Sequence, residues 1–241
     1  MKKLGIIIPA YRESENIASL CADILLNYPN ADLLIIDDSP DDLTVKAIAA
    51  MTPQRSEIKI IHRGAKGGRG DAVFFGLRQM IDGDCDYFLE MDADFSHAPK
   101  EIPLLVSYLE DHHLDLVIGS RYLKKSRILN WSLSRKVFSR CSNFLAKTVL
   151  QVPVSDYTNG FRLYNKPAAL EVTKTCGKLG SGFIALSEIL VNLYYRNYQI
   201  GEIPTVFVNR VRGESLVSHK EILNALIGLS RIWRFKRELT K

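Results

Sequence analysis

Short runs of branched apolar residues alternate with helix-like patterns along the first half of the chain. The runs have the composition and length of buried β-strands and lie at residues 3–11, 31–40, 57–63, 86–92 and 114–122. Apolar residues at helical spacing fill the intervals between them, over residues 17–24, 43–51, 70–81 and 101–112. Strands that alternate with helices of about ten residues indicate a mainly parallel sheet with helices on both faces.

In such a sheet, ligands bind beyond the carboxyl ends of the strands. Most of the unusual polar residues of the chain follow a predicted strand directly. They are Tyr11 after Pro9 and Ala10, the pair Asp37 and Asp38, Arg63, the triplet Asp92, Ala93 and Asp94, and the pair Ser120 and Arg121. We therefore expect these side chains to converge on one edge of the sheet.

After Tyr122 the alternation changes. The pattern predicts a basic helix over 131–150, a strand or turn over 157–165, an apolar helix over 182–197 and a β run over 199–210. A last helical pattern over 218–239 carries an apolar stripe, with Ile222, Leu226, Leu229 and Trp233. We expect a folded domain over residues 1–217 and a C-terminal amphipathic helix over 218–241.

Composition and charge narrow the class of protein. A chain of 241 residues with 46% hydrophobic content can bury one sizeable core. The net charge of +5 is modest, but residues 119–147 contain eight lysines or arginines and no acidic residue. An anionic partner is therefore expected at the second half of the chain. Four scattered cysteines favour a reducing compartment, the cytosol, and no run of apolar residues is long enough to span a membrane.

Three carboxylates stand at alternate positions at the end of the fourth predicted strand. Glu90, Asp92 and Asp94 share one face of an extended chain, where they repel one another unless a cation intervenes. Oxygen ligands of this kind suit Mg²⁺ or Mn²⁺. We expect Asp92 and Asp94 to bind the metal and Glu90 to pair with a basic group, although a solvated turn also produces an Asp-x-Asp sequence.

Together, the turn at residues 9–13, the acidic end of the second strand and "DADFSH" at residues 92–97 resemble glycosyltransferase family 2. The resemblance implies a GT-A fold, a Rossmann-like sheet in which Asp92 and Asp94 hold Mg²⁺ or Mn²⁺ on the diphosphate of a nucleotide sugar. It further implies that Asp38 reads the base or ribose. The remaining donor contacts implied are Pro9, Tyr11, Glu13, Lys66, Gly70 and Ala93, with Arg69 as a further candidate.

Motifs in the second half resemble the polyprenyl-phosphate sugar transferases of that family, such as dolichyl-phosphate mannose synthase. They are "VIGSRY", the spacing Trp131-x-x-x-Arg135-x-x-x-Ser139, "SDYTNGFRLY", "SEIL" and Phe207-x-x-Arg210-x-x-Gly213-Glu214-Ser215. By resemblance, Arg121, Arg135 and Ser139 bind the acceptor phosphate, and Arg210 lies near the donor diphosphate. An ionised phosphate needs no general base, so we expect direct displacement with inversion at the sugar carbon.

The resemblance leaves the donor and the membrane attachment open. GDP-mannose is the leading donor, and a UDP-hexose is the alternative. The last helix either completes the core or lies in the membrane interface, with Trp233 among basic residues. We expect a protein peripheral to the cytoplasmic face of a membrane, or one held there by an anchoring partner subunit.

Three other functions remain less favoured by the sequence. A family 2 transferase with a soluble saccharide acceptor would need a general base and no basic region. A non-catalytic binding module would not need Asp92, Asp94, Arg121, Arg135 and Arg210 together. A nucleic-acid binder is not expected, because no stacking aromatics interleave with the basic residues on a recognisable module.

Overall fold

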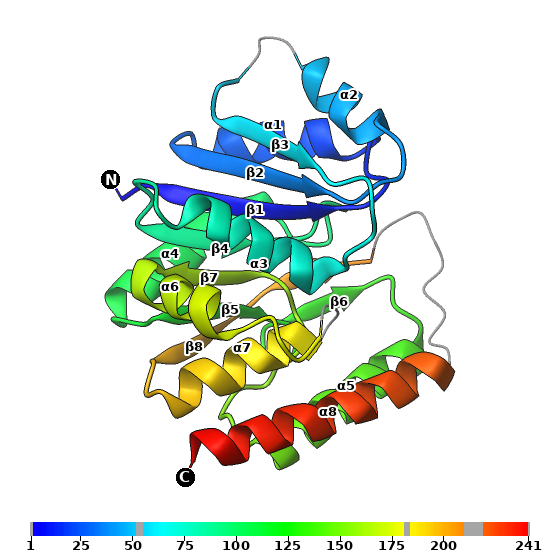
Figure 1. Ribbon diagram of the computed structural model, residues 1–241, viewed down its shortest axis with the longest axis vertical. Helices are drawn as coiled ribbons and strands as arrows, with labels where there is room; N and C mark the ends of the chain where they lie inside the picture. The colour runs from blue at the N-terminus through cyan, green and yellow to red at the C-terminus, as the bar shows by residue number, and fades with distance from the viewer. Residues whose placement is uncertain (1, 52–54, 181–183, 210–218, 241) are drawn as a thin grey trace.

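The computed structural model describes residues 2–51, 55–180, 184–209 and 219–240, with side chains in the last range from residue 227 onward. Its centre is a seven-stranded sheet (Figure 1). In spatial order the strands are β3 (Ile58–His62), β2 (Ala31–Asp37), β1 (Leu4–Ala10), β4 (Tyr87–Glu90), β7 (Arg162–Asn165), β5 (Leu116–Ser120) and β8 (Ile200–Pro204).

Neighbouring strands of this sheet run parallel except at β7, which is antiparallel to both β4 and β5. The branched apolar residues of β1 and β2 are almost all buried, as expected for strands covered on both faces. The α/β class, the mainly parallel sheet and the helices on both faces are confirmed. The five predicted strands of the first half are β1 to β5.

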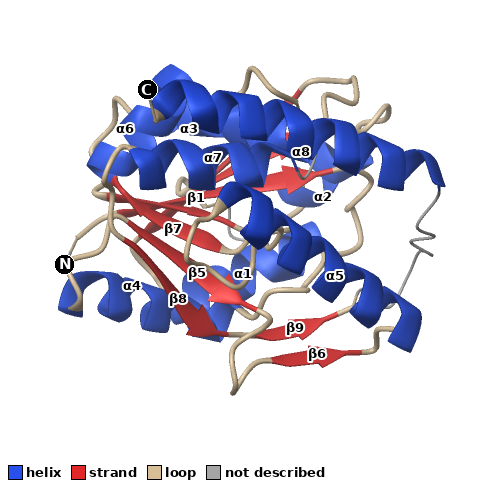
Figure 2. Cartoon of the chain, turned by 90° about the horizontal axis from the view of Figure 1, so that it is seen from below, coloured by secondary structure: helices blue, strands red, loops and turns tan. Residues whose placement is uncertain are grey.

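Helices cover the sheet in two layers, and each layer closes a separate hydrophobic core. On one face lie α1 (Ile17–Asn27) and α4 (Ile102–Asp111), the latter after a 3-10 turn at Pro99–Glu101. On the other lie α3 (Arg69–Met80), α6 (Lys166–Thr175) and α7 (Ile184–Tyr195), as Figure 2 shows. The short α2 (Leu43–Ala49) packs at the β3 edge against α1.

Two long helices contact each other, and the second also packs against α7 (Figures 1 and 2). They are α5 (Leu133–Leu150) and α8 (His219–Leu239). In α8, Ile232 is buried in the core, and Leu229, Phe235 and Leu239 pack against it, whereas Trp233 is 40% exposed. Of the predicted stripe, Leu229 faces the core and Trp233 does not, while the side chains of Ile222 and Leu226 lie outside the described residues. The division at residue 217 stays a prediction.

Several predicted boundaries change in the second half. The predicted β run over 199–210 is two strands, β8 and β9 (Val206–Val208), which belong to different sheets. A three-residue strand, β6 (Arg127–Leu129), pairs with β9 and was not predicted, nor was α6. Across the described part of the chain, no helix has both the length and the apolar content to cross a bilayer.

Candidate active site

The parallel register brings the predicted polar residues to one edge of the sheet. The ends of β1 and β2 are in register, because Ala10 pairs with Asp37 and the Asp38 N–H donates to the Ala10 carbonyl at 3.0 Å. The neighbouring strand β4 runs parallel to β1 and leads into Asp92. Arg121 follows β5 on the other side of β7. The predicted convergence of strand ends is therefore present in the fold.

Asp94 is held by a local turn. Its Oδ1 accepts hydrogen bonds from the Ser96 N–H at 3.0 Å and from the Ser96 hydroxyl at 2.5 Å. This is the geometry by which aspartate stabilises a turn two residues ahead, and Phe95 between them has a positive φ of 59°. Among the described residues, Asp94 Oδ2 has no hydrogen-bond partner, so one carboxylate oxygen is available to a ligand.

Asp92 is also bound through only one of its carboxylate oxygens, here by Arg69 in the first turn of α3. Arg69 Nε donates to Asp92 Oδ1 at 2.7 Å, and Nη1 donates to Glu90 Oε2 at 2.9 Å. The Asp92 side chain is 31% exposed, and its Oδ2 has no partner within the described part of the chain. The expectation that Glu90 pairs with a basic group is confirmed, and Arg69 is that group.

A glycine makes room for this arginine. Arg69 Nη2 donates to the Gly160 carbonyl at 2.9 Å, and a Cβ added to Gly160 would lie 1.8 Å from Nη2. Tyr164 closes the network by donating its hydroxyl to Glu90 Oε1 at 2.6 Å. The glycine of "TNGF" is therefore required by the close approach of Arg69 to its backbone.

The charges of this network stabilise one another. Burial acts to raise the pKa of Asp92, but the positive charge and hydrogen bond of Arg69 outweigh it, and the pKa lies below its usual value. Burial likewise acts to lower the pKa of Arg69. The negative charges of Asp92 and Glu90 outweigh burial, so the pKa of Arg69 is raised. Asp92 is therefore ionised at neutral pH, as a metal ligand requires.

His97 supports the same loop from behind and is not a free metal ligand. Its Nδ1 accepts from the Asp92 N–H at 3.2 Å, and its Nε2 lies 3.0 Å from Asn159 Oδ1. These partners fix the neutral tautomer with the proton on Nε2, and burial lowers the pKa of His97. Asn159 in turn donates to the Gly119 carbonyl, which ties the end of β4 to that of β5.

An arginine forms an ion pair with Asp38 at the acidic end of β2. Arg63 binds Asp38 through two bonds, Nε to Oδ1 at 2.6 Å and Nη2 to Oδ2 at 2.8 Å, and its Nη1 reaches Asp71 at 2.6 Å. Asp38 Oδ2 also accepts from the Gly67 N–H at 2.9 Å. Asp38 thus fixes the loop before α3. Its contact with base or ribose stays a prediction.

Other predicted donor contacts surround this point. Tyr11 is 38% exposed, and the ammonium of Lys66 lies 4.5 Å from its ring centroid. Glu13 accepts from the Asn16 side chain at 2.8 Å. The remaining three residues lie within the fold at Pro9 in β1, at Gly70 in the first turn of α3 and at Ala93 between the two aspartates. The contacts of these six residues with the donor stay a prediction.

Arg121, at the end of β5, forms a buried ion pair. Its Nε and Nη2 donate to the two carboxylate oxygens of Asp156, each at 2.8 Å, and Nη2 reaches the Thr158 hydroxyl at 2.7 Å. Burial opposes both charges, but their mutual attraction outweighs it, so the pKa of Arg121 is raised and that of Asp156 is lowered. Asp156 also accepts from the Asn159 N–H, as expected for a residue that orders this turn.

The other predicted acceptor residues lie on α5. Arg135 stacks over the ring of Trp131, with its guanidinium carbon 4.3 Å from the centroid, and donates to Asn209 Oδ1 at 3.0 Å. The hydroxyls of Ser139 and Tyr122 are 2.6 Å apart. Arg121 also contacts Trp131, at 5.5 Å, so the structure brings Arg121 and Arg135 to the same indole ring. Arg210 lies outside the described residues.

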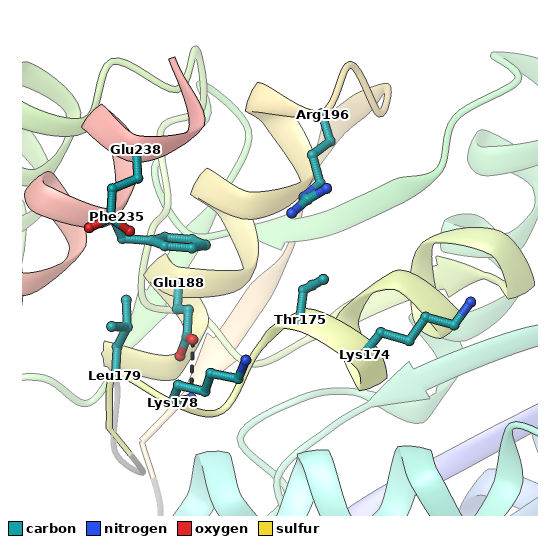
Figure 3. Close-up of a pocket in the computed structure, with 8 residues that line it drawn as sticks. All are labelled: Lys174, Thr175, Lys178, Leu179, Glu188, Arg196, Phe235 and Glu238. Atoms are coloured by element: carbon teal, nitrogen blue, oxygen red, sulfur yellow. Dashed lines mark hydrogen bonds between the residues drawn. The ribbon is translucent and has the colours of Figure 1, made fainter. Parts of the chain in front are cut away.

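Glu188, on α7, lies apart from these residues and binds backbone groups. Its Oε1 accepts from the backbone N–H groups of Gly177 and Lys178, at 3.1 and 3.2 Å. Its Oε2 is buried, has no partner among the residues that the structure describes, and faces a cavity of about 350 Å³ between α6, α7 and α8 (Figure 3). Glu188 therefore fixes the backbone of Gly177 and Lys178, which follow α6.

The described side chains can supply only some of the ligands of a divalent metal. Within the described ranges, no group of three or more histidine, cysteine or acidic side chains could enclose an ion. Asp92 and Asp94 instead offer one oxygen each, which leaves the rest of the coordination shell to water or to phosphate oxygens. Mg²⁺ and Mn²⁺ accept such mixed shells, so the residues present fit a metal that arrives with a diphosphate.

Comparison with known proteins assigns the family. The sequence profile of "Glycosyl transferase family 2" matches residues 5–173. An undecaprenyl-phosphate mannosyltransferase of Micrococcus luteus is 30% identical over 93% of this chain and 91% of its own. A polyprenol monophosphomannose synthase of Mycolicibacterium smegmatis is 29% identical over 98% of this chain and 88% of its own.

Solved structures agree with the fold. Glucosyl-3-phosphoglycerate synthase of Mycobacterium tuberculosis, crystallised with Mn²⁺, UDP and its product, superimposes with a TM-score of 0.68. The similarity covers 98% of this chain and 80% of that one at 19% identity, so it bears on the fold alone. With the profile match over most of the chain, the comparisons show that this protein is a glycosyltransferase and belongs to glycosyl transferase family 2.

Proposed function

We propose that the protein transfers a sugar, with mannose the leading candidate, from a nucleoside-diphosphate sugar to a polyprenyl phosphate. One observation carries this proposal most directly. The two carboxylates that offer one oxygen each, Asp92 and Asp94, share a sheet edge with a basic cluster built on Arg121 and Arg135. Both curated relatives are named for this type of transfer.

The donor half of the site supplies charge compensation. Mg²⁺ or Mn²⁺, bound with the nucleotide sugar, would neutralise the diphosphate that leaves. Asp92 and Asp94 would hold it through the oxygens that Arg69 and Ser96 do not occupy. Arg69 keeps Asp92 ionised. Asp38 and Lys66 are proposed to contact the nucleotide, Asp38 at the base or ribose. The related synthase crystallised with Mn²⁺ and UDP is consistent with this role.

The acceptor half determines the chemistry. A phosphate monoester is already ionised near neutral pH, so its oxygen can attack the sugar carbon without a general base. The bond from that carbon to the diphosphate breaks as the bond to the acceptor phosphate forms, and the configuration inverts. Arg121, Arg135 and Ser139 would orient the acceptor, because guanidinium groups form strong charge-assisted hydrogen bonds with phosphate. Asp156 holds the Nε and Nη2 edge of Arg121 in place. Arg210 is proposed to stabilise the departing diphosphate.

The acceptor is a lipid, so we also propose that the protein works at a membrane surface. The outer stripe of α5 carries Leu133, Val137 and Phe144, which are 77%, 53% and 73% exposed. Arg140 and Lys147 interleave with them. Exposed apolar residues mixed with basic ones favour binding to anionic lipid. A position peripheral to the cytoplasmic face agrees with this surface, alone or with an anchoring partner.

A transfer assay tests the proposal. Purified protein with Mg²⁺ or Mn²⁺ and a short polyprenyl phosphate is supplied with labelled GDP-mannose or UDP-hexoses in turn, and label extracted into organic solvent is counted. We expect one donor to give a lipid-linked product and Asp94→Ala to reduce its formation at least a hundredfold, since about 3 kcal/mol of transition-state stabilisation is lost. Asp82→Ala, an exposed carboxylate near α3, is the matched control.

The same assay decides among the alternatives. A product formed only with a soluble saccharide would refute the lipid acceptor, and retention of configuration in the product would refute direct displacement. Nucleotide binding without transfer to any acceptor would indicate a binding module. Activity that survives chelation of divalent ions would remove the metal from the mechanism.

A further inference from the structure

Trp131 carries a buried hydrogen-bond donor with no acceptor. The residue precedes α5, its side chain is only 9% exposed, and its indole Nε1–H has no partner among the described residues. Such buried donors are rare in folded proteins, because a lost bond to water must be replaced. The orphan donor therefore indicates a ligand that supplies the acceptor.

Two guanidinium groups lie against this indole, and that of Arg121 is also paired with Asp156. The guanidinium carbon of Arg135 lies 4.3 Å from the ring centroid and that of Arg121 lies 5.5 Å away. Phe207 packs its ring edge against the indole at 5.4 Å, which fixes the orientation of Trp131. The first turn of α5 begins at the next residues, with Ser132 as its N-cap, and contributes the partial positive charge of a helix N-terminus.

These features share one preference. An indole N–H can donate and cannot accept, guanidinium groups can only donate, and a helix N-terminus presents donors. A ligand that satisfies all of them offers acceptors and negative charge. A neutral hydroxyl would satisfy the indole N–H, but it carries no charge to interact with the guanidinium of Arg135 on the ring face.

We propose that the Trp131 Nε1–H donates a hydrogen bond to a phosphate oxygen of the acceptor, so that Trp131 helps the site to select a phosphate monoester over a neutral alcohol. This inference rests on the proposed function and adds a residue to which the sequence motif assigned only a spacing. The ring has a second role, because its face holds the guanidinium of Arg135 in place.

The first test separates the N–H from the ring. Trp131→Phe keeps an aromatic face for Arg135 and removes the donor. Loss of a hydrogen bond to a charged group predicts an increase of about ten- to a hundredfold in KM for a short polyprenyl phosphate. KM for the nucleotide sugar should stay within about twofold, since Asp92 and Asp94 are unchanged. Trp233→Phe, at the other tryptophan of the chain, is the matched control.

The second test does not depend on turnover. In Trp233→Phe, Trp131 is the only indole, so intrinsic fluorescence reports on this site alone. Titration with a short polyprenyl phosphate should change the emission, and titration with the corresponding polyprenol should not. This measurement keeps the proposal testable even if Trp131→Phe fails to fold.

The outcomes distinguish the two proposals. Two results together would overturn the role of Trp131 and leave the reaction intact. Trp131→Phe would transfer sugar with an unchanged KM for the acceptor, and the fluorescence of Trp131 in Trp233→Phe would not change when the polyprenyl phosphate is added. Emission that responds to the phosphate in a protein that transfers no sugar would support phosphate binding at Trp131 and refute the reaction. Equal responses to phosphate and alcohol would overturn the claimed selectivity.

Discussion

Arg69 places one positive charge between the carboxylates of Glu90 and Asp92, which stand two positions apart at the end of β4. Its side chain is only 17% exposed, so solvent screens these contacts weakly. The arginine also decides which oxygen of Asp92 is left for a metal. Its role is therefore one of position as well as charge.

Replacement of Arg69 by methionine should destabilise the protein and weaken metal binding together. The change leaves the buried Glu90 and the partly buried Asp92 without this counter-charge, and a broken buried pair costs about 3–5 kcal/mol. We expect a lower midpoint in urea denaturation and weaker Mn²⁺ binding by electron paramagnetic resonance. Arg69→Lys keeps the charge but cannot bridge both carboxylates. Its denaturation midpoint and Mn²⁺ affinity should lie between those of the parent protein and those of Arg69→Met.

Arg78→Met is the control for this experiment, because Arg78 is an exposed arginine on the same helix. It should leave both the denaturation midpoint and Mn²⁺ binding unchanged. Full Mn²⁺ affinity in a folded Arg69→Met variant would show that Asp92 does not depend on the arginine for its orientation.

What the sequence could predict at this scale was local. Asp92, Asp94 and their turn follow one strand, so their proximity could be expected from spacing alone. The partners came from far along the chain: Gly160 lies 91 positions from Arg69, and Asp156 lies 35 from Arg121. The motif "SDYTNGFRLY" contains Asp156 and Gly160, but it does not identify their partners, because only the fold brings these residues together.

The helices and strands with a clear hydrophobic pattern of their own were predicted. A strand that forms only because another strand pairs with it was not. β6 has three residues, two of them exposed, and exists because β9 pairs with it. α6 did have a local signal that was missed. Asn165 caps it by accepting from the Ala168 N–H at 2.9 Å, and proline follows in the first turn.

The loop between α6 and α7 depends on Glu188, and this gives a pH prediction. Burial raises the pKa of Glu188 above its usual value of 4.5, although the backbone donors oppose this. The folded state therefore binds this proton more tightly than the unfolded state does. The free energy of unfolding contributed by Glu188 is present at low pH and falls as the pH rises above about 4.5.

Glu188→Gln removes the ionisation and keeps an oxygen for the N–H groups of Gly177 and Lys178. We expect the variant to be more stable than the parent by about 1 kcal/mol at pH 7, with a smaller difference at pH 4. Thermal denaturation at both pH values measures this, with Glu238→Gln across the cavity as the control. A constant difference between the two pH values would contradict the expected ionisation.

At the scale of the whole molecule, charge and exposed apolar surface are unevenly distributed. The sheet edge that carries Asp92 and Asp94 continues, past β5, to Arg121, Trp131 and the start of α5. The long axis of α5 then carries the exposed stripe of Leu133, Val137 and Phe144 away from the site. A lipid whose phosphate is bound near Trp131 could therefore meet apolar side chains that belong to the membrane-facing surface.

This arrangement predicts where the protein contacts a membrane. Phe144→Ser should weaken binding to vesicles that contain anionic phospholipid by about tenfold, because burial of a phenylalanine contributes roughly 1.5–3 kcal/mol. Leu26→Ser, which alters an 80% exposed leucine on α1, is the control and should have no effect. Co-sedimentation at low and high salt separates the apolar from the basic contribution, since salt screens only the latter. Equal losses in the two variants, or none in either, would mean that α5 does not form the contact surface, and the lipid would then reach Trp131 from another side.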